Sequence, residues 1–147
     1  MATTAFRQPY SDALECGPTF GGTLMLILRH IGAVLAGIVA VVALSVATDV
    51  LLQSTIFPEL EHKNAPNALL LIATAYRTLY GVLGGYVTAR LAPNAAMTDV
   101  TVLGAIGTAA ALAGALTMQG ESAAWYPWTL VVLALPQTLL GGYLAKR

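Results

Sequence analysis

Four long apolar stretches dominate this sequence, and they limit the folds that the chain can adopt. They cover residues 31–52, 68–91, 100–118 and 123–145. A helix needs roughly 20 apolar residues to cross the hydrocarbon core of a bilayer, because each residue advances it by about 1.5 Å. Each stretch is close to this length or above it, so we expect four membrane-spanning helices.

Charged residues are scarce, and the apolar stretches contain almost none. Only 10% of the 147 residues are charged, whereas a soluble domain usually carries about 25%. Asp49 lies in the first stretch and Arg77 in the interior of the second, with Arg90 at its end. A helical bundle in water is the alternative, but it needs polar outer faces that these segments lack. The sequence therefore predicts an all-α fold, a bundle of four transmembrane helices.

Short polar segments at residues 57–67, 92–94 and 119–122 separate the apolar stretches. Such short connections make consecutive helices antiparallel neighbours. We expect a flexible N-terminal cytoplasmic tail over residues 1–22. Met25, just beyond this tail, is a second candidate for the start of the protein. A transmembrane domain over residues 23–147 follows, with helices over about 31–54, 68–91, 99–118 and 124–145. A cleaved signal peptide is an alternative for the first helix, but the apolar run exceeds the roughly 7 to 15 residues of such a signal.

Basic residues are unevenly distributed between the two ends of the expected bundle. One end carries Arg29, Arg90, Lys146 and Arg147. The loops at the other end carry only Lys63. Because loops rich in Lys and Arg stay in the cytoplasm, both termini are predicted to be cytoplasmic. Trp125 and Trp128 then fall at the outer interface, where amphipathic aromatic rings anchor helices.

The ends of the second and fourth stretches are similar to each other. Residues 82–90 read Val-Leu-Gly-Gly-Tyr-Val-Thr-Ala-Arg, and residues 139–147 read Leu-Leu-Gly-Gly-Tyr-Leu-Ala-Lys-Arg. An offset of two helices predicts two hairpins that are parallel repeats, related by an axis along the membrane normal. Coincidence is the alternative, because Leu, Gly, Ala and a terminal Arg are common in membrane helices.

Glycines recur in the last three helices and predict the surfaces through which helices pack. In lipid, helices associate by close van der Waals contact, and a residue without a Cβ lets a neighbouring backbone approach. The candidate packing residues are Gly81, Gly84, Gly85, Gly104, Gly107, Gly114, Gly141 and Gly142. Such seams favour binding of a second copy of the chain or of another membrane protein. A substrate path lined by small residues is the alternative.

Asp49 and Arg77 form a candidate polar pair inside the membrane. Their expected depths differ by only a few ångströms at 1.5 Å per residue, so an ion pair between the first two helices is feasible. An isolated charge at the centre of a span costs roughly 2.5 to 3.5 kcal/mol, which favours pairing. The pair is either a structural clasp, the simpler hypothesis, or part of a polar seam that binds an ion, a proton or a small polar ligand.

The sequence offers little for catalysis or for binding a metal, a cofactor or nucleic acid. His30 and His62 lie at opposite ends of the expected bundle, and Cys16 is the only cysteine, so neither a metal cluster nor a disulfide is expected. The catalytic and phosphate-binding motifs HExxH, GxSxG and the glycine-rich loop are missing. The net charge is zero, so no basic field attracts nucleic acid. We expect a protein that is not an enzyme, holds no cofactor and has the lipid bilayer as its surroundings.

The chain resembles a group of uncharacterised small bacterial four-helix integral membrane proteins. These carry an Arg-flanked, Gly- and Ala-rich first helix, here residues 29–37, and a Gly-Gly-Tyr-x-x-Ala-Arg-Leu-Ala-Pro segment, here residues 84–93. The resemblance covers residues 25–147. It implies a four-helix fold in a bacterial cell (inner) membrane and supplies no activity.

The chain is also similar in size to small multidrug-resistance transporters, which are short four-helix proteins with a coupling Glu in the first helix. No Glu occurs in residues 31–52, and Asp49 lies nearer the outer end than that role requires. The expected function is therefore that of a non-enzymatic scaffold or accessory subunit acting through helix packing. The alternative is a small transporter or channel that uses a polar seam around Asp49 and Arg77.

Overall fold

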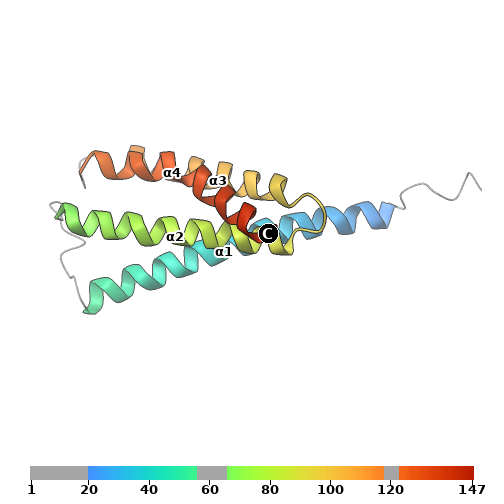
Figure 1. Cartoon of the computed structure of the whole chain (residues 1–147), viewed down its shortest axis with the longest axis horizontal. Coiled ribbons are helices and arrows are strands. Elements are labelled where there is room, and N and C mark those ends of the chain that lie inside the picture. The colour runs from blue at the N-terminus through green and yellow to red at the C-terminus, as the bar shows by residue number, and fades with distance from the viewer. Residues whose placement is uncertain (1–19, 56–65, 118–122) are drawn as a thin grey trace, which may run out of the picture.

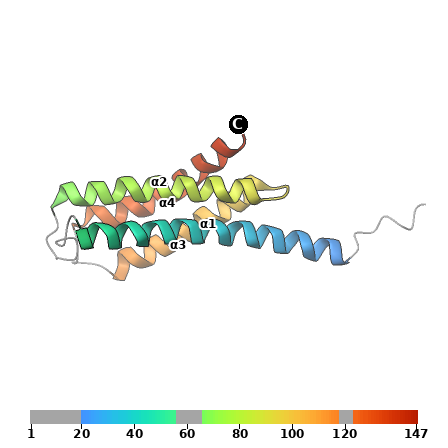
Figure 2. The same ribbon diagram turned by 90° about the horizontal axis from the view of Figure 1, so that it is seen from below.

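The apolar stretches form four long helices in a computed structural model of the chain (Figures 1 and 2). The structure describes residues 20–55, 66–117 and 123–147. The helices are α1 (Phe20–Thr55), α2 (Asn67–Leu91), α3 (Ala96–Thr117) and α4 (Trp125–Ala145). All four are long and apolar enough to cross a membrane, and the described residues include no strand. The chain is an all-α, multi-pass membrane protein, as the hydropathy pattern predicted.

α1 is longer than predicted. It begins at Phe20 and has 36 residues, whereas the sequence indicated a helix from about residue 31 and a tail up to residue 22. At 1.5 Å per residue α1 extends for about 54 Å, well over the roughly 30 Å of a hydrocarbon core. The N-terminal part of α1 continues beyond the other helices (Figure 2). Residues 20–22 are therefore helical, and the rest of the predicted tail lies outside the described residues.

Consecutive helices are antiparallel, so α1 runs parallel to α3 and α2 runs parallel to α4 (Figure 1). The beginnings of α2 and α4 are joined by a hydrogen bond in which Trp125 Nε1 donates to Asn67 Oδ1 at 3.3 Å. Pro66 precedes α2, and Pro93 follows it closely. Since proline cannot supply the N–H that continues a helix, Pro93 ensures that α2 stops before the short connection to α3.

The closest helix contact joins α2 and α4 through their glycine pairs. A Cβ on Gly85 would collide with the carbonyl oxygen of Thr138, and a Cβ on Gly141 would collide with the carbonyl oxygen of Val82. Both glycines are buried. The two backbones therefore touch directly, which is the geometry that small residues permit between helices in lipid.

The parallel course of α2 and α4 is the one that a parallel repeat requires. However, the two Gly-Gly pairs make different contacts. Gly84 faces Val41 of α1 and Gly85 faces α4, whereas Gly141 faces α2 and Gly142 faces Val100 of α3. Gly85 and Gly141 thus have equivalent positions in the fold although they are one residue out of register in the sequence. The internal repeat stays a prediction.

Pro136 interrupts α4 between its two halves. A proline inside a helix removes one backbone hydrogen bond and bends the axis. The last turns of α4 lean away from the line of its first turns (Figure 2). The hydroxyl of Thr138 donates to the carbonyl oxygens of Leu135 at 2.9 Å and Ala134 at 3.3 Å beside this bend.

Candidate functional site

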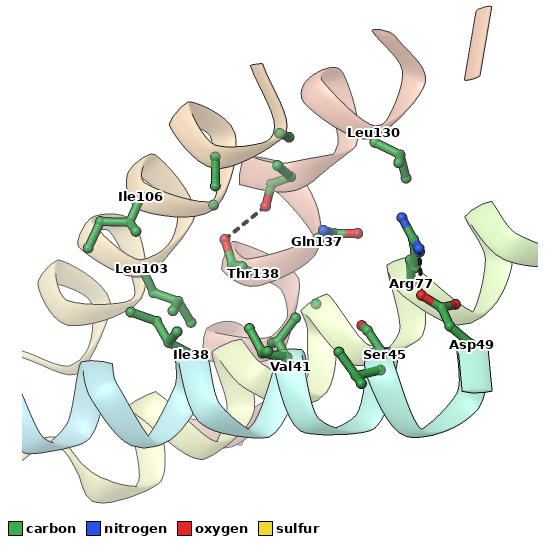
Figure 3. A pocket seen from close by; sticks show the side chains of 17 residues that line it. Ile38, Val41, Ser45, Asp49, Arg77, Leu103, Ile106, Leu130, Gln137 and Thr138 are labelled. Atoms are coloured by element: carbon green, nitrogen blue, oxygen red, sulfur yellow. Dashed lines mark hydrogen bonds and ion pairs between the residues drawn. The ribbon is translucent and has the colours of Figure 1, made fainter. Parts of the chain in front are cut away.

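A half-open cavity of about 410 Å³ lies between α1 and the other helices, with side chains from all four helices around it (Figure 3). Val42, Val46 and Ile106 in its wall are exposed. Most of its wall is apolar and comes from α1, α3 and α4. Five polar residues also line it: Ser45, Asp49, Arg77, Gln137 and Thr138. A largely apolar cavity with a few polar groups in it is the usual form of a small-molecule site.

The cavity exists because α1 diverges from α3 at this level and α3 presents only small side chains there (Figure 1). Toward its C-terminal end α1 diverges from α3 and α4 (Figure 1). The facing part of α3 carries Gly107, Ala110 and Ala111, whose side chains are too small to fill the gap. Nothing lies within 4 Å of a Cβ built on Gly107.

The expected ion pair between Asp49 and Arg77 is present at the edge of the cavity. Arg77 Nη2 donates to Asp49 Oδ2 at 2.7 Å, and the hydroxyl of Tyr76 donates to Asp49 Oδ1. One turn further along α2, the hydroxyls of Tyr80 and Thr48 are 2.8 Å apart. Both carboxylate oxygens of Asp49 are therefore bonded, and the C-terminal half of α1 is joined to α2 by side-chain hydrogen bonds.

Three polar groups at the cavity have no partner within the described residues. Arg77 Nε is buried without a hydrogen bond, and neither the Gln137 amide nor the Ser45 hydroxyl has a hydrogen bond to the protein there. Gln137 from α4 and Arg77 from α2 point into the same space, with Ser45 on α1 nearby (Figure 3). For the buried Arg77 Nε an unmade hydrogen bond costs about 1 to 3 kcal/mol. Gln137 and Ser45 are half-buried, so they are available to an occupant that can bond.

Beyond the cavity, α1 touches α2 at Gly37. A Cβ on Gly37 would collide with Thr88 Oγ1 and would lie 3.0 Å from the carbonyl oxygen of Gly84. Thr88 is fully buried and its hydroxyl oxygen has no conventional hydrogen bond. Contacts of this kind between a Cα–H and an oxygen recur at helix interfaces. The sequence pattern pointed to Gly84 but missed Gly37, because the predicted packing glycines were all in the last three helices.

The predicted packing glycines divide into two groups. A Cβ would meet a neighbouring helix at Gly81, Gly84, Gly85, Gly104, Gly141 and Gly142. At Gly107 and Gly114 it would meet nothing within 4 Å. These two glycines of α3 are therefore not contact points among the described residues of one copy of the chain, and their part in packing against another helix stays a prediction. Gly107 lines the cavity instead.

A second polar contact, between His30 and Asp99, was not predicted. His30 Nδ1 lies 2.7 Å from Asp99 Oδ2, and Asp99 is buried in the first turn of α3. A carboxylate there also benefits from the positive end of the helix dipole. The sequence could have indicated this contact, since His30 and Asp99 lie at the same expected end of the bundle. The contact ties α1 to α3 on the far side of Gly37 from the cavity.

The described residues bring no group of three His, Cys, Asp or Glu side chains together as metal ligands. His62 and Cys16 lie outside the described residues. The groups that line the cavity can offer a ligand hydrogen bonds, charge and apolar contact.

No protein-family model, curated protein or solved structure matches this chain. The resemblance to small bacterial four-helix membrane proteins therefore stays a prediction. What supports a function is the geometry of the cavity and of the polar residues beside it.

Proposed function

We propose that this chain is a small transporter of a bacterial inner membrane, and that the cavity is its substrate site. The observation that carries the proposal is a half-open cavity of about 410 Å³ between four helices that are long and apolar enough to cross a membrane, lined in part by Asp49, Arg77 and Gln137. Its volume lies within the roughly 300 to 1,000 Å³ of ligand sites. Polar residues placed inside a membrane bundle commonly mark substrate or ion paths.

Transport requires part of the bundle to move, and the contacts of α1 allow it to be that part. The backbones of α2 and α4 touch at Gly85 and Gly141, so these helices form a fixed frame. α1 is held to α2 by a close approach at Gly37. Polar contacts on either side of Gly37 join α1 to α2 at Asp49 and to α3 at His30. Rocking of α1 about Gly37 opens one end of the bundle while it closes the other, as in alternating access.

In this scheme each of the two polar contacts is a latch, meaning a contact that holds one end of α1 against a neighbouring helix. Asp49–Arg77 holds α1 at the outer end, and His30–Asp99 holds it at the cytoplasmic end. This assignment uses the orientation in which both termini are cytoplasmic, as the basic residues beside His30 and at the C-terminus favour. Each latch is a small number of bonds that can break and reform, unlike the contact between the α2 and α4 backbones.

A test that needs no known substrate is the accessibility of the cavity to water. Ser45→Cys, with the native thiol removed by Cys16→Ser, is exposed to a charged, membrane-impermeant methanethiosulfonate in sealed vesicles. Ala47→Cys is the matched control, because Ala47 lies on the exposed face of the same helix and does not line the cavity. We expect Ser45→Cys to react at least ten times faster than Ala47→Cys, and Gly107→Leu to remove the difference. Equal rates for the two thiols would exclude a water-accessible path and with it the transporter.

A scaffold that binds another helix is the second candidate, favoured by the open space at Gly107 and Gly114 on α3. Gly114→Leu separates the two functions, because Gly114 does not line the cavity. In a scaffold this substitution weakens self-association or partner binding, measured by crosslinking in membranes. In a transporter it leaves the labelling of Ser45→Cys unchanged.

A further inference from the structure

The lining of the cavity indicates which chemical class of molecule it accepts, and this inference rests on the cavity being the substrate site proposed above. Three features of the lining bear on this class: the state of its two charges, the polar groups without a partner, and the character of the remaining wall.

The two charged side chains at the cavity are engaged with each other. Asp49 is bonded through both carboxylate oxygens, to Arg77 and to Tyr76. Asp49 uses only one donor of the Arg77 guanidinium, and Arg77 Nε is left free. An ionic ligand bound beside the intact pair adds a net charge to a neutral lining, and one that displaces a member of the pair leaves the other charge unpaired. The lining as a whole is neutral, so it is complementary to a neutral ligand.

The polar groups that remain are suited to uncharged hydrogen-bonding partners. The Gln137 amide donates and accepts, and the Ser45 hydroxyl does both as well. They belong to opposite walls, α4 and α1, and neither has a hydrogen bond to the described part of the protein. A carbonyl, amide or hydroxyl group placed between them can form a hydrogen bond with the Gln137 amide and with the Ser45 hydroxyl at the same time.

The rest of the wall is apolar and branched, including Ile38, Val42 and Val46 of α1 and Leu103 and Ile106 of α3. A wall of this kind binds a hydrocarbon body through burial of apolar area, at about 25 cal/mol per Å². Asp49, Arg77 and Gln137 lie toward one side of the cavity, and Ile38, Leu103 and Ile106 lie toward the other (Figure 3). Head and body of the ligand therefore occupy different parts of the cavity.

We propose that the cavity binds an uncharged amphipathic molecule, which has a carbonyl, amide or hydroxyl head placed between Gln137 and Ser45 and an apolar body against α1 and α3. Such a molecule reaches the site either from water or, as a neutral lipid, from the bilayer. The hydrogen bonds of the head replace those that Gln137 and Ser45 lack.

Three probes with the same hydrocarbon chain and different heads test this inference: decanamide, decanoate and decyltrimethylammonium. The readout is the melting temperature of the full chain in lipid nanodiscs, because a ligand that binds only the folded state raises it. We expect decanamide to raise the melting temperature of the wild type at concentrations at least ten times lower than the two ionic probes. Gly107→Leu, which fills the cavity, is expected to remove this shift. Gly114→Leu, on the same helix and outside the cavity, is expected to retain it.

A second arm distinguishes the two sources of the ligand. Monoolein placed in the nanodisc tests entry from the bilayer, and decanamide added in buffer tests entry from water. The probe that raises the melting temperature of the wild type, but not of Gly107→Leu, identifies the route. The inference is overturned if an ionic probe acts at equal or lower concentration than decanamide, or if no probe gives a shift that depends on Gly107. Labelling of Ser45→Cys reports on the transport proposal separately, so a water-accessible cavity that prefers an ion would refute this inference alone.

Discussion

Glycine has opposite consequences in two parts of this bundle. Where α2 crosses α4, Gly85 and Gly141 bring two backbones into contact and leave no space. On α3, Gly107 and Gly114 face open space, and at Gly107 that space is the cavity. A missing side chain produces a contact only if the facing helix moves in. The crossing of α2 and α4 meets that condition, and the diverging α1 does not.

This difference separates a fixed part of the molecule from an adjustable one. At the crossing, backbone atoms would have to move to admit even one methyl group, whereas α1 is held beside the cavity by side-chain bonds at Thr48 and Asp49. Side chains change rotamer far more easily than packed backbones separate. Substitutions in the two parts should therefore differ in size and sometimes in sign.

The largest effect is expected from Gly85→Leu. The new side chain collides with the backbone of Thr138, which cannot move without separating α2 from α4. Overpacking a tight contact costs about 1 to 3 kcal/mol and more when backbone must shift, so we expect a loss of about 3 kcal/mol or more in the free energy of unfolding. Titration of purified protein with SDS in mixed micelles measures it. A loss below about 1 kcal/mol would show that the two backbones are not in contact.

The next largest effect is expected at the ion pair. Asp49→Leu and Arg77→Leu each leave one charge unpaired, and we expect each to lower the free energy of unfolding by about 2 kcal/mol, since both side chains are partly exposed. The double substitution should recover most of the loss, because no unpaired charge remains. The same titration gives the coupling energy. Additive losses in the double variant would mean that the pair contributes nothing jointly.

Features that depend on the order of residues within each helix were predictable from the sequence. The four spans followed from hydropathy, and the partnership of Asp49 with Arg77 followed from their equal depth and the cost of an isolated charge in lipid. The length of α1 was underestimated because Arg29 and His30 were taken as its beginning, although residues 24–28 are apolar and continue the helix.

The features that depend on how helices cross were not predictable. Spacing alone gave Gly104 and Gly107 equal weight, yet one meets Thr138 of α4 and the other faces the cavity. The close contact at Gly37 was missed for the same reason, since only the approach of Thr88 distinguishes it from its small neighbours. The cavity itself results from the divergence of α1 from α3 and α4, which no local pattern encodes.

A smaller loss is expected from His30→Ala at the other contact of α1. Asp99 is buried and loses its partner, but it keeps the favourable position in the first turn of α3. We expect the free energy of unfolding to fall by about 1 kcal/mol. His30→Asn, which retains a side chain that can donate to Asp99, serves as the control and should lose less. If the two variants are equally stable, hydrogen bonding to Asp99 is not what His30 contributes.

The smallest effect on stability is expected from Gly107→Leu, the counterpart of Gly85→Leu. The leucine enters space in which nothing lies within 4 Å of the added Cβ, and replacing glycine in a helix is itself favourable by up to about 1 kcal/mol. We therefore expect the free energy of unfolding to stay within about 1 kcal/mol of the wild type or to rise. Gly114→Leu, also in open space, should behave alike in this measurement.

A loss of more than about 2 kcal/mol in Gly107→Leu, with Gly114→Leu unaffected, would contradict the comparison directly. It would mean that α1 and α3 meet at Gly107 in the membrane, so that this glycine also serves a close contact and the cavity is closed in the most stable state. Together with the Gly85→Leu result, the measurement therefore decides whether the bundle has one tight crossing and one open face, or two tight crossings.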